Sequence, residues 1–137
     1  MTARSSRAGL AGLLTAALAL GVSAPAPAAP SGSPSAAERA PTRLGVTGRE
    51  FSLVFSRPLI APGDSLVQFQ NAGEDEHDLA WKRIPGDHPT RQIGIVLPQE
   101  QSDPARTKFK AGARYRFWCT IADHRQRGMK ATLRVSR

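Results

Sequence analysis

Apolar and polar residues alternate along much of the chain between residues 51 and 135, a pattern typical of strands with one buried face. The residues that we expect to face the core together are Phe51, Leu53 and Phe55; Val67 and Phe69; His77, Leu79 and Trp81; Ile93, Ile95 and Leu97; Tyr115, Phe117 and Cys119; and Ala131, Leu133 and Val135. Turn sequences such as NAGEDE, IPGDHP and KAGA separate these segments. The pattern predicts a β-sandwich of about seven short strands and leaves one helical turn open between residues 98 and 108.

The first 42 residues do not share this pattern. Arg4 and Arg7 precede an apolar stretch from Ala8 to Val22, which is shorter than the roughly 20 residues that cross a bilayer. We therefore predict a signal peptide over residues 1–28, export to the periplasm or the extracellular space, and no integral membrane segment after cleavage. Residues 29–42 are rich in Pro, Ala and Ser and are expected to form a disordered tail. Residues 43–137 have the length of one small domain.

The chain has a single cysteine, and its neighbours suggest a metal site. Cys119 ends a strand on the core side, and His124 and Met129 follow it at short intervals. If the strand that begins at His77 runs beside it, a thiolate, two imidazoles and a thioether meet. This is the ligand set of a mononuclear copper electron-transfer site. Taken singly, the cysteine and the methionine would be read as buried apolar residues and the histidines as surface residues.

The order of these residues resembles the cupredoxins, specifically the secreted blue copper proteins of the plastocyanin and azurin type. The resemblance rests on PGD followed by VQFQN and His77, then on YRFWCTIADH, and finally on GMKATLRV at the last strand. It implies a Greek-key β-sandwich of about seven to eight strands that binds one copper ion. It also implies that the metal ligands are His77, Cys119, His124 and Met129, and that the protein is a one-electron carrier.

Residues beside two of these ligands depart from the pattern of the family. Asp78 stands where members often have asparagine, and Ala122 and Asp123 stand where many have a Pro-Gly pair. We expect Asp78 to accept a hydrogen bond from Thr120 across the site. Its negative charge near the thiolate is predicted to stabilise Cu(II) and to lower the reduction potential relative to an asparagine.

The charge of the chain suggests the kind of partner. The formal net charge of +8 becomes +6 without the two arginines of the predicted signal. Arg125, Arg127, Lys130, Lys82 and Arg83 are near the ligands in sequence and are candidates for docking an acidic redox protein. A solvated cationic surface without a partner would show the same charges.

Other function classes find less support. The sequence has no basic-aromatic ladder for nucleic acid, no nucleophile elbow and no His-Glu-x-x-His motif, so we predict neither nucleic-acid binding nor enzymatic activity. A monomer is expected. Two alternatives to electron transfer stay open, namely storage or delivery of copper and a metal-free β-sandwich that binds another molecule.

Overall fold

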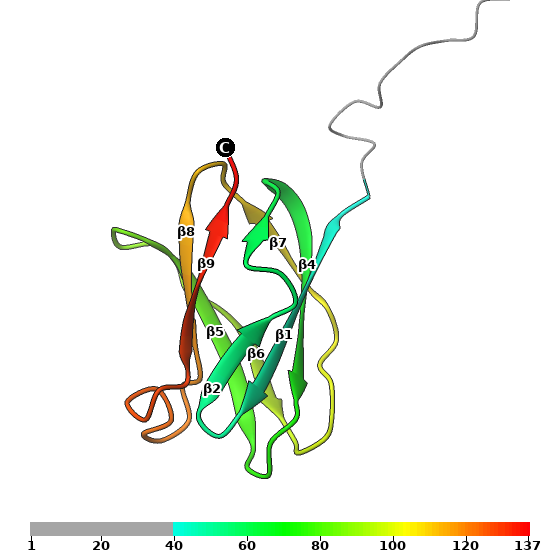
Figure 1. Cartoon of the computed structure of the whole chain (residues 1–137), viewed down its shortest axis with the longest axis vertical. Helices are drawn as coiled ribbons and strands as arrows, with labels where there is room; N and C mark the ends of the chain where they lie inside the picture. Colours follow the sequence, from blue (N-terminus) through cyan, green and yellow to red (C-terminus); the bar gives the residue numbers. More distant parts are fainter. Residues whose placement is uncertain (1–39) are drawn as a thin grey trace, which may run out of the picture. The chain divides into compact units, whose positions relative to one another are not determined.

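The computed structural model describes residues 40–137, which form nine strands and no helix, so the all-β prediction is confirmed (Figure 1). The strands are β1 (Thr42–Arg49), β2 (Ser52–Phe55), β3 (Leu59–Ile60), β4 (Gly63–Asn71), β5 (His77–Ile84), β6 (Arg91–Val96), β7 (Ala105–Phe109), β8 (Arg114–Trp118) and β9 (Lys130–Val135). The predicted signal peptide and the tail up to residue 39 lie outside the described residues. Residues 40–137 contain no helical segment of the length and hydrophobicity that a membrane crossing requires.

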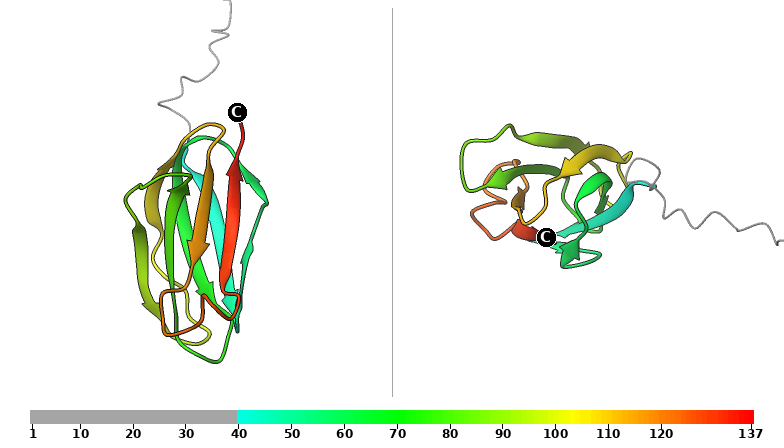
Figure 2. Two further views of the ribbon diagram at one scale, coloured as in Figure 1. Left: turned by 90° about the vertical axis from the view of Figure 1, so that its left-hand side faces the viewer. Right: turned by 90° about the horizontal axis from the view of Figure 1, so that it is seen from above.

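The strands form two sheets that pack face to face (Figure 2). One sheet has four strands in the order β2-β1-β4-β7, and the other has five in the order β3-β9-β8-β5-β6. Both sheets are mixed, because β1 runs parallel to β4 and β3 runs parallel to β9. The parallel pairing of β1 with β4 lets the turn after β1 and the loop after β4 leave the sandwich at the same end.

The core lies between the sheets and is built from the alternating positions. Val67, Phe69, Phe117 and Leu133 are fully buried. Trp81 stacks on Phe117 with ring centroids 5.6 Å apart. Burial of these large side chains supplies the main stabilisation of a domain of this size. The alternation predicted for the strands around residues 67, 117 and 133 is therefore confirmed.

The prediction for the strand around residue 93 is wrong beyond its first residue. Ile93 is buried, but Ile95 and Leu97 are 61% and 52% exposed, and Val96 faces the core instead. The cause is a register shift, because Leu79 pairs with Ile93 whereas His77 pairs with Val96. The extra residue of β6 forms a bulge that reverses the inward and outward positions beyond it.

Several connections meet at one end of the sandwich, the lower end in Figure 1, and three of them surround the predicted ligands. These three are the turn between β1 and β2, the loop between β4 and β5, and the loop that runs from the end of β8 to the start of β9. The last of these contains Cys119, His124 and Met129, and the loop between β4 and β5 leads directly into His77. The fold thus brings the four predicted ligands to one end of the molecule.

Candidate metal centre

Cys119 lies directly after β8 and is completely buried. Its Sγ is 3.6 Å from Nδ1 of His124. Burial raises the pKa of the Cys119 thiol, while hydrogen bonds from the backbone N–H groups of Asp78 and Ile121 act in the opposite direction. A buried thiol that receives such hydrogen bonds is suited to a metal, which replaces the proton and favours the thiolate.

The two histidines approach this sulfur from different elements. His77 begins β5 and is completely buried, and His124, in the loop after Cys119, is 7% exposed. Their Nδ1 atoms are 3.2 Å apart, and their rings meet edge to face at 74°. One ligand atom from each of His77, Cys119 and His124 lies within 4.8 Å of the others. A soft sulfur and two imidazole nitrogens thus converge in a buried space.

Met129 closes the loop that carries Cys119 and His124. Its carbonyl oxygen accepts a hydrogen bond from the N–H of Cys119 at 3.1 Å, and its own N–H donates to the carbonyl oxygen of His124 at 2.9 Å. The Met129 side chain is completely buried. A Cβ added to Gly48 of β1 would lie only 2.9 Å from the Met129 methyl group, so the backbone of β1 packs closely against the methionine. These contacts fix the loop from both ends.

Asp78 joins the start of β5 to the residue after the cysteine. Its carboxylate accepts a hydrogen bond from the backbone N–H of Thr120 at 2.5 Å and another from the Thr120 hydroxyl. Gln92 of β6 donates a third through Nε2 at 2.8 Å. Asp78 as a whole is only 2% exposed, so these donors replace the water that its carboxylate would bind in solution. Asp78 therefore holds the start of β5 against the Cys119 loop.

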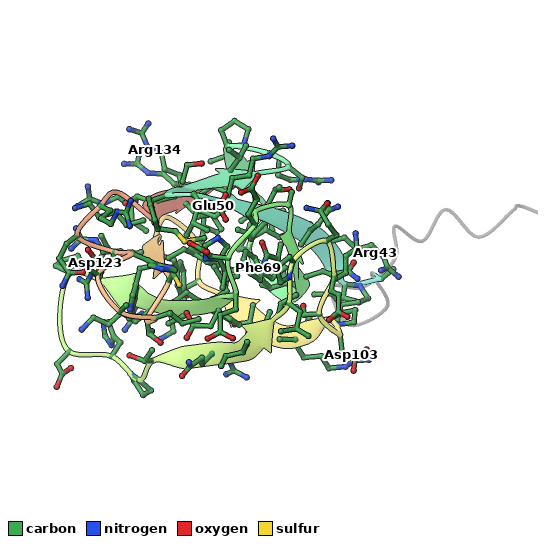
Figure 3. The ribbon with its side chains drawn as sticks, turned by 90° about the horizontal axis from the view of Figure 1, so that it is seen from below. Arg43, Glu50, Phe69, Asp103, Asp123 and Arg134 are labelled. Atoms are coloured by element: carbon green, nitrogen blue, oxygen red, sulfur yellow. The ribbon has the colours of Figure 1, made fainter. Side chains whose placement is uncertain are left out.

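The turn between β1 and β2 supplies two contacts that the sequence analysis missed. Glu50 Oε1 lies 3.2 Å from Nε2 of His77. The Phe51 ring meets the His124 ring edge to face, with centroids 4.9 Å apart. In Figure 3, which looks onto this end of the sandwich, Glu50 lies between the two sheets. The sequence carries no signal for this pairing, because Glu50 is 27 residues from His77.

Glu50 is strongly held in its ionised form. Its Oε1 accepts hydrogen bonds from the backbone N–H groups of Glu74 and Asp75 at 2.6 and 2.9 Å. The hydrogen bond from Asp75 contributes most, and the pKa of Glu50 falls from its ordinary value of 4.5 to about 2, although partial burial acts against this change. The side chain is 28% exposed. At neutral pH the group beside His77 is therefore a carboxylate.

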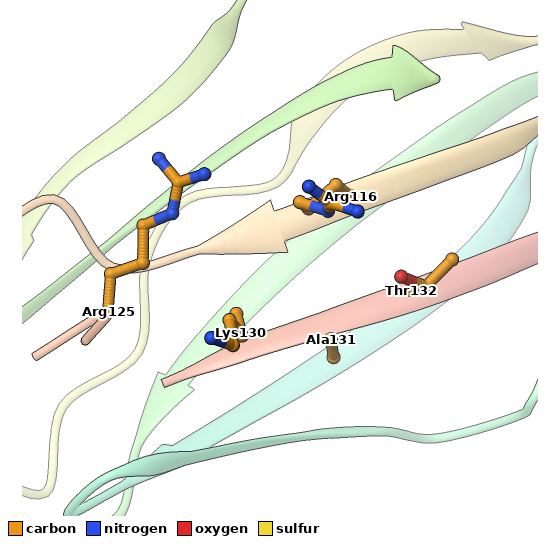
Figure 4. Close-up of a pocket in the computed structure, with 5 residues that line it drawn as sticks. All are labelled: Arg116, Arg125, Lys130, Ala131 and Thr132. Atoms are coloured by element: carbon orange, nitrogen blue, oxygen red, sulfur yellow. The ribbon is translucent and has the colours of Figure 1, made fainter. Parts of the chain in front are cut away.

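The five cationic residues proposed for docking do not form a single patch. Arg125 lies over the Trp118 ring at 4.9 Å, and together with Lys130, Arg116 and Thr132 it lines a groove of about 400 Å³ (Figure 4). In the paired register Lys82 faces Arg116, which places Lys82 on this same side of the sheet. We call the three cations that line the groove, Arg116, Arg125 and Lys130, the cationic groove.

The other two candidates lie elsewhere. Arg127 packs its guanidinium 3.4 Å from the centre of the Phe51 ring. Arg83 Nη2 lies 3.1 Å from Nδ1 of His88, in the turn between β5 and β6. The cationic groove itself lies on the outer face of the five-stranded sheet, because Arg116, Lys130 and Thr132 are exposed residues of β8 and β9. Arg125 places it beside the loop that carries His124.

Comparison with solved structures identifies the fold. Dithionite-reduced auracyanin from Roseiflexus castenholzii has a TM-score of 0.55 and 16% identity, over 72% of this chain and 100% of that chain. Auracyanin A from Chloroflexus aurantiacus, described as a "blue" copper protein, has a TM-score of 0.55 and 15% identity, over 71% of this chain and 100% of that chain. Rusticyanin from Thiobacillus ferrooxidans has a TM-score of 0.53 and 17% identity, over 71% of this chain and 79% of that chain. No model of a known protein family matches the chain, and no curated protein matches its sequence.

These likenesses show that the chain has the cupredoxin fold, as the sequence analysis predicted. The donor set provides an independent test of whether a metal suits the site. One cysteine and two histidines converge through atoms that all bind soft or borderline metals, and a buried methionine adjoins the same loop. The residues present therefore fit a single copper ion.

Proposed function

We propose that this protein is an exported one-electron carrier with one copper ion, held by Nδ1 of His77, Sγ of Cys119, Nδ1 of His124 and the thioether of Met129. The observation that carries the proposal is that three buried donor atoms, one sulfur and two imidazole nitrogens, lie within 4.8 Å of one another. These are the atom types that copper binds. A copper ion there supplies a redox centre that alternates between Cu(II) and Cu(I).

The surrounding residues support fast electron transfer because they resist rearrangement. Cys119 and Met129 are tied to each other through the backbone, and Asp78 binds the segment that follows Cys119. A soft thiolate favours the reduced metal while the imidazoles suit both oxidation states. A donor set held in one geometry cannot relax toward the geometry preferred by Cu(II) or by Cu(I). The reorganisation energy of electron transfer is therefore small. Burial of the donors also excludes water from the site.

His124 is the proposed point of electron entry and exit. Of the three donors in the cluster it is the only one with measurable exposure, 7% against 0% for His77 and Cys119. The cationic groove lies beside the loop that carries it. We propose that an acidic redox protein docks on this side, steered by an attraction that weakens as salt is added.

The first experiment is a titration of purified apoprotein with Cu(II), followed by visible absorption and electron paramagnetic resonance. We expect an intense thiolate-to-copper charge-transfer band that saturates at one equivalent and is absent from a Cys119→Ala variant. His88→Ala is the matched control, because His88 lies outside the cluster and its loss leaves the band in place. A folded protein with a reduced thiol and no such band would refute the copper site.

A second measurement separates electron transfer from copper delivery. A carrier holds its metal while exchanging electrons, so we expect rapid self-exchange between oxidised and reduced protein and slow loss of Cu(I) to a competing chelator. Rapid release of Cu(I) together with slow electron exchange would favour delivery and contradict the proposed role.

A further inference from the structure

We propose that Glu50 is a positioning residue for the metal centre, which fixes the tautomer and orientation of His77 so that its Nδ1 lone pair faces Cys119 and His124. The effect of Glu50 on metal binding rests on the proposed function. Its effect on the His77 ring rests only on the contact between the two side chains. Glu50 is neither a predicted ligand nor a sequence neighbour of one.

The hydrogen bond between Glu50 and His77 can have only one direction. A carboxylate can only accept, so at 3.2 Å from Glu50 Oε1 the Nε2 atom of His77 must carry the proton. A neutral imidazole has one protonated nitrogen, and Nδ1 of His77 is therefore the unprotonated one. This is the nitrogen that faces His124 at 3.2 Å. Glu50 thus selects the tautomer in which the inward nitrogen is free to bind a metal.

Backbone hydrogen bonds hold the Glu50 carboxylate in place. Glu50 Oε1 accepts from the backbone N–H groups of Glu74 and Asp75, which belong to the loop that leads into His77. The carboxylate therefore binds both the His77 ring and the chain that precedes it. Bound at three points, it cannot leave the ring without breaking hydrogen bonds to the backbone. This arrangement fixes the angle at which His77 enters the site.

The Glu50 carboxylate occupies space that is left free by a glycine. A Cβ on Gly73 would lie 2.1 Å from Glu50 Oε1 and 2.7 Å from its Cδ, closer than nonbonded atoms approach. Gly73 is itself buried. The absence of a side chain at position 73 therefore allows the carboxylate to reach His77, and a single methyl group would displace it.

The consequences for the two histidines differ. With Nδ1 of His77 unprotonated, the short contact between the two rings requires His124 to donate from its own Nδ1 in the metal-free protein. His124 has an edge at the surface, where exchange with water can move that proton to Nε2. His77 has no exposed surface, and its tautomer is set in advance by Glu50.

The test uses four variants of the full chain. Glu50→Ala removes the acceptor, and Gly73→Ala keeps the carboxylate but displaces it. Glu50→Gln retains a neutral acceptor and is the conservative rescue. Glu74→Gln is the matched control, because it removes one negative charge from an exposed side chain of the same loop. Amide NMR spectra report whether each variant is folded.

The first readout needs no metal. Nitrogen-15 NMR of the apoprotein is expected to show His77 protonated at Nε2 in the wild type, in Glu50→Gln and in Glu74→Gln. In Glu50→Ala and Gly73→Ala we expect a mixture of the two tautomers. A wild-type His77 protonated at Nδ1, or a tautomer unchanged in a folded Glu50→Ala variant, would overturn the proposal.

The second readout is the affinity for Cu(II), measured by competition with a chelator. Loss of an outer-shell partner of a ligating histidine typically costs about 10- to 100-fold in affinity, and we expect this loss for Glu50→Ala and Gly73→Ala. Glu50→Gln should recover part of it, and the exposed charge lost in Glu74→Gln should cost about fivefold or less. Equal affinities for Glu50→Ala and Glu74→Gln would refute the role toward the metal. A wild type that binds no copper would refute the proposed function, while the tautomer readout would still decide the contact between Glu50 and His77.

Discussion

Removing the charge of Glu50 is expected to lower the stability of the apoprotein at neutral pH but not in acid. The carboxylate accepts two backbone hydrogen bonds and one from His77, and its pKa falls to about 2. A carboxyl group whose pKa is lower in the folded than in the unfolded chain stabilises the fold where it is ionised in both states. That contribution is complete above pH about 4.5 and is lost as the pH falls toward 2.

The size of the effect follows from the same values. A pKa that is 4.5 in the unfolded chain and about 2 in the folded chain would contribute about 3 kcal/mol to the free energy of unfolding if the difference counted in full. Because the side chain is 28% exposed, water screens part of it, and we expect about 1–2 kcal/mol for Glu50→Gln at pH 7. For a domain of this length that is roughly 5–15 °C in Tm.

Urea denaturation of metal-free wild type, Glu50→Gln and Glu74→Gln between pH 7 and pH 2 measures this contribution. The gap in unfolding free energy between wild type and Glu50→Gln should be largest above pH about 5 and nearly closed at pH about 2, because the protonated glutamic acid then resembles glutamine. Glu74→Gln should stay close to wild type at every pH. Parallel curves for wild type and Glu50→Gln would show that the reasoning from the pKa is wrong.

Three further predictions concern the site, the core and the docking face. Asp78→Asn should raise the reduction potential by tens of millivolts in protein film voltammetry, because it keeps the contact with the Cys119 loop but removes a negative charge near the thiolate. Gly48→Ala should lower the unfolding free energy by about 1–3 kcal/mol in urea, since the new Cβ would lie 2.6 Å from the Phe69 ring. Reversing the charges of Arg125 and Lys130 in the cationic groove to glutamate should slow oxidation of the reduced protein by hexacyanoferrate(III) roughly tenfold at low ionic strength.

Each of these predictions has a control variant or an outcome that would contradict it. A potential that is unchanged or lower in Asp78→Asn would contradict the proposed effect of the carboxylate. Gly94→Ala, where a Cβ meets no atom within 4 Å, should cost far less stability than Gly48→Ala. Charge reversal at Arg106 and Lys108, two exposed residues of β7 in the other sheet, changes the net charge by the same amount and should change the oxidation rate much less than reversal in the groove. If both reversals slow oxidation equally, net charge rather than the groove is responsible.

Much of the fold was predictable because it depends on properties local to the chain. Side chains of a strand alternate between two faces, so the burial of Val67, Phe69 and Phe117 follows from their spacing. The same rule placed Cys119 on the core side, and the short loop after it limits how far His124 can lie from the sulfur. The order of these residues predicted the class of site before any contact was known.

Other features depended on how distant segments pair. The bulge between β5 and β6 exposes Ile95 and buries Val96, and it arises from the register of two strands rather than from the sequence of either. Likewise, Lys82 shares a face with the cationic groove because β5 pairs with β8, whereas its neighbour Arg83 turns toward His88. Lys82 and Arg83 are adjacent in sequence, but their side chains lie on opposite faces of the sheet. Distance along the chain from His77 therefore could not show which of them lies near the groove.

The sequence by itself determined most of the strands that build the core, and it predicted the donor residues and their chemistry, because each depends on residue type and short-range spacing. Only the tertiary structure decided that Glu50 and Phe51 contact the two histidines. These contacts arise because β1 runs parallel to β4, so that the turn after one strand and the loop after the other emerge at the same end. A parallel pair joins segments without a local turn between them, and nothing in the sequence near either segment specifies which residues will meet.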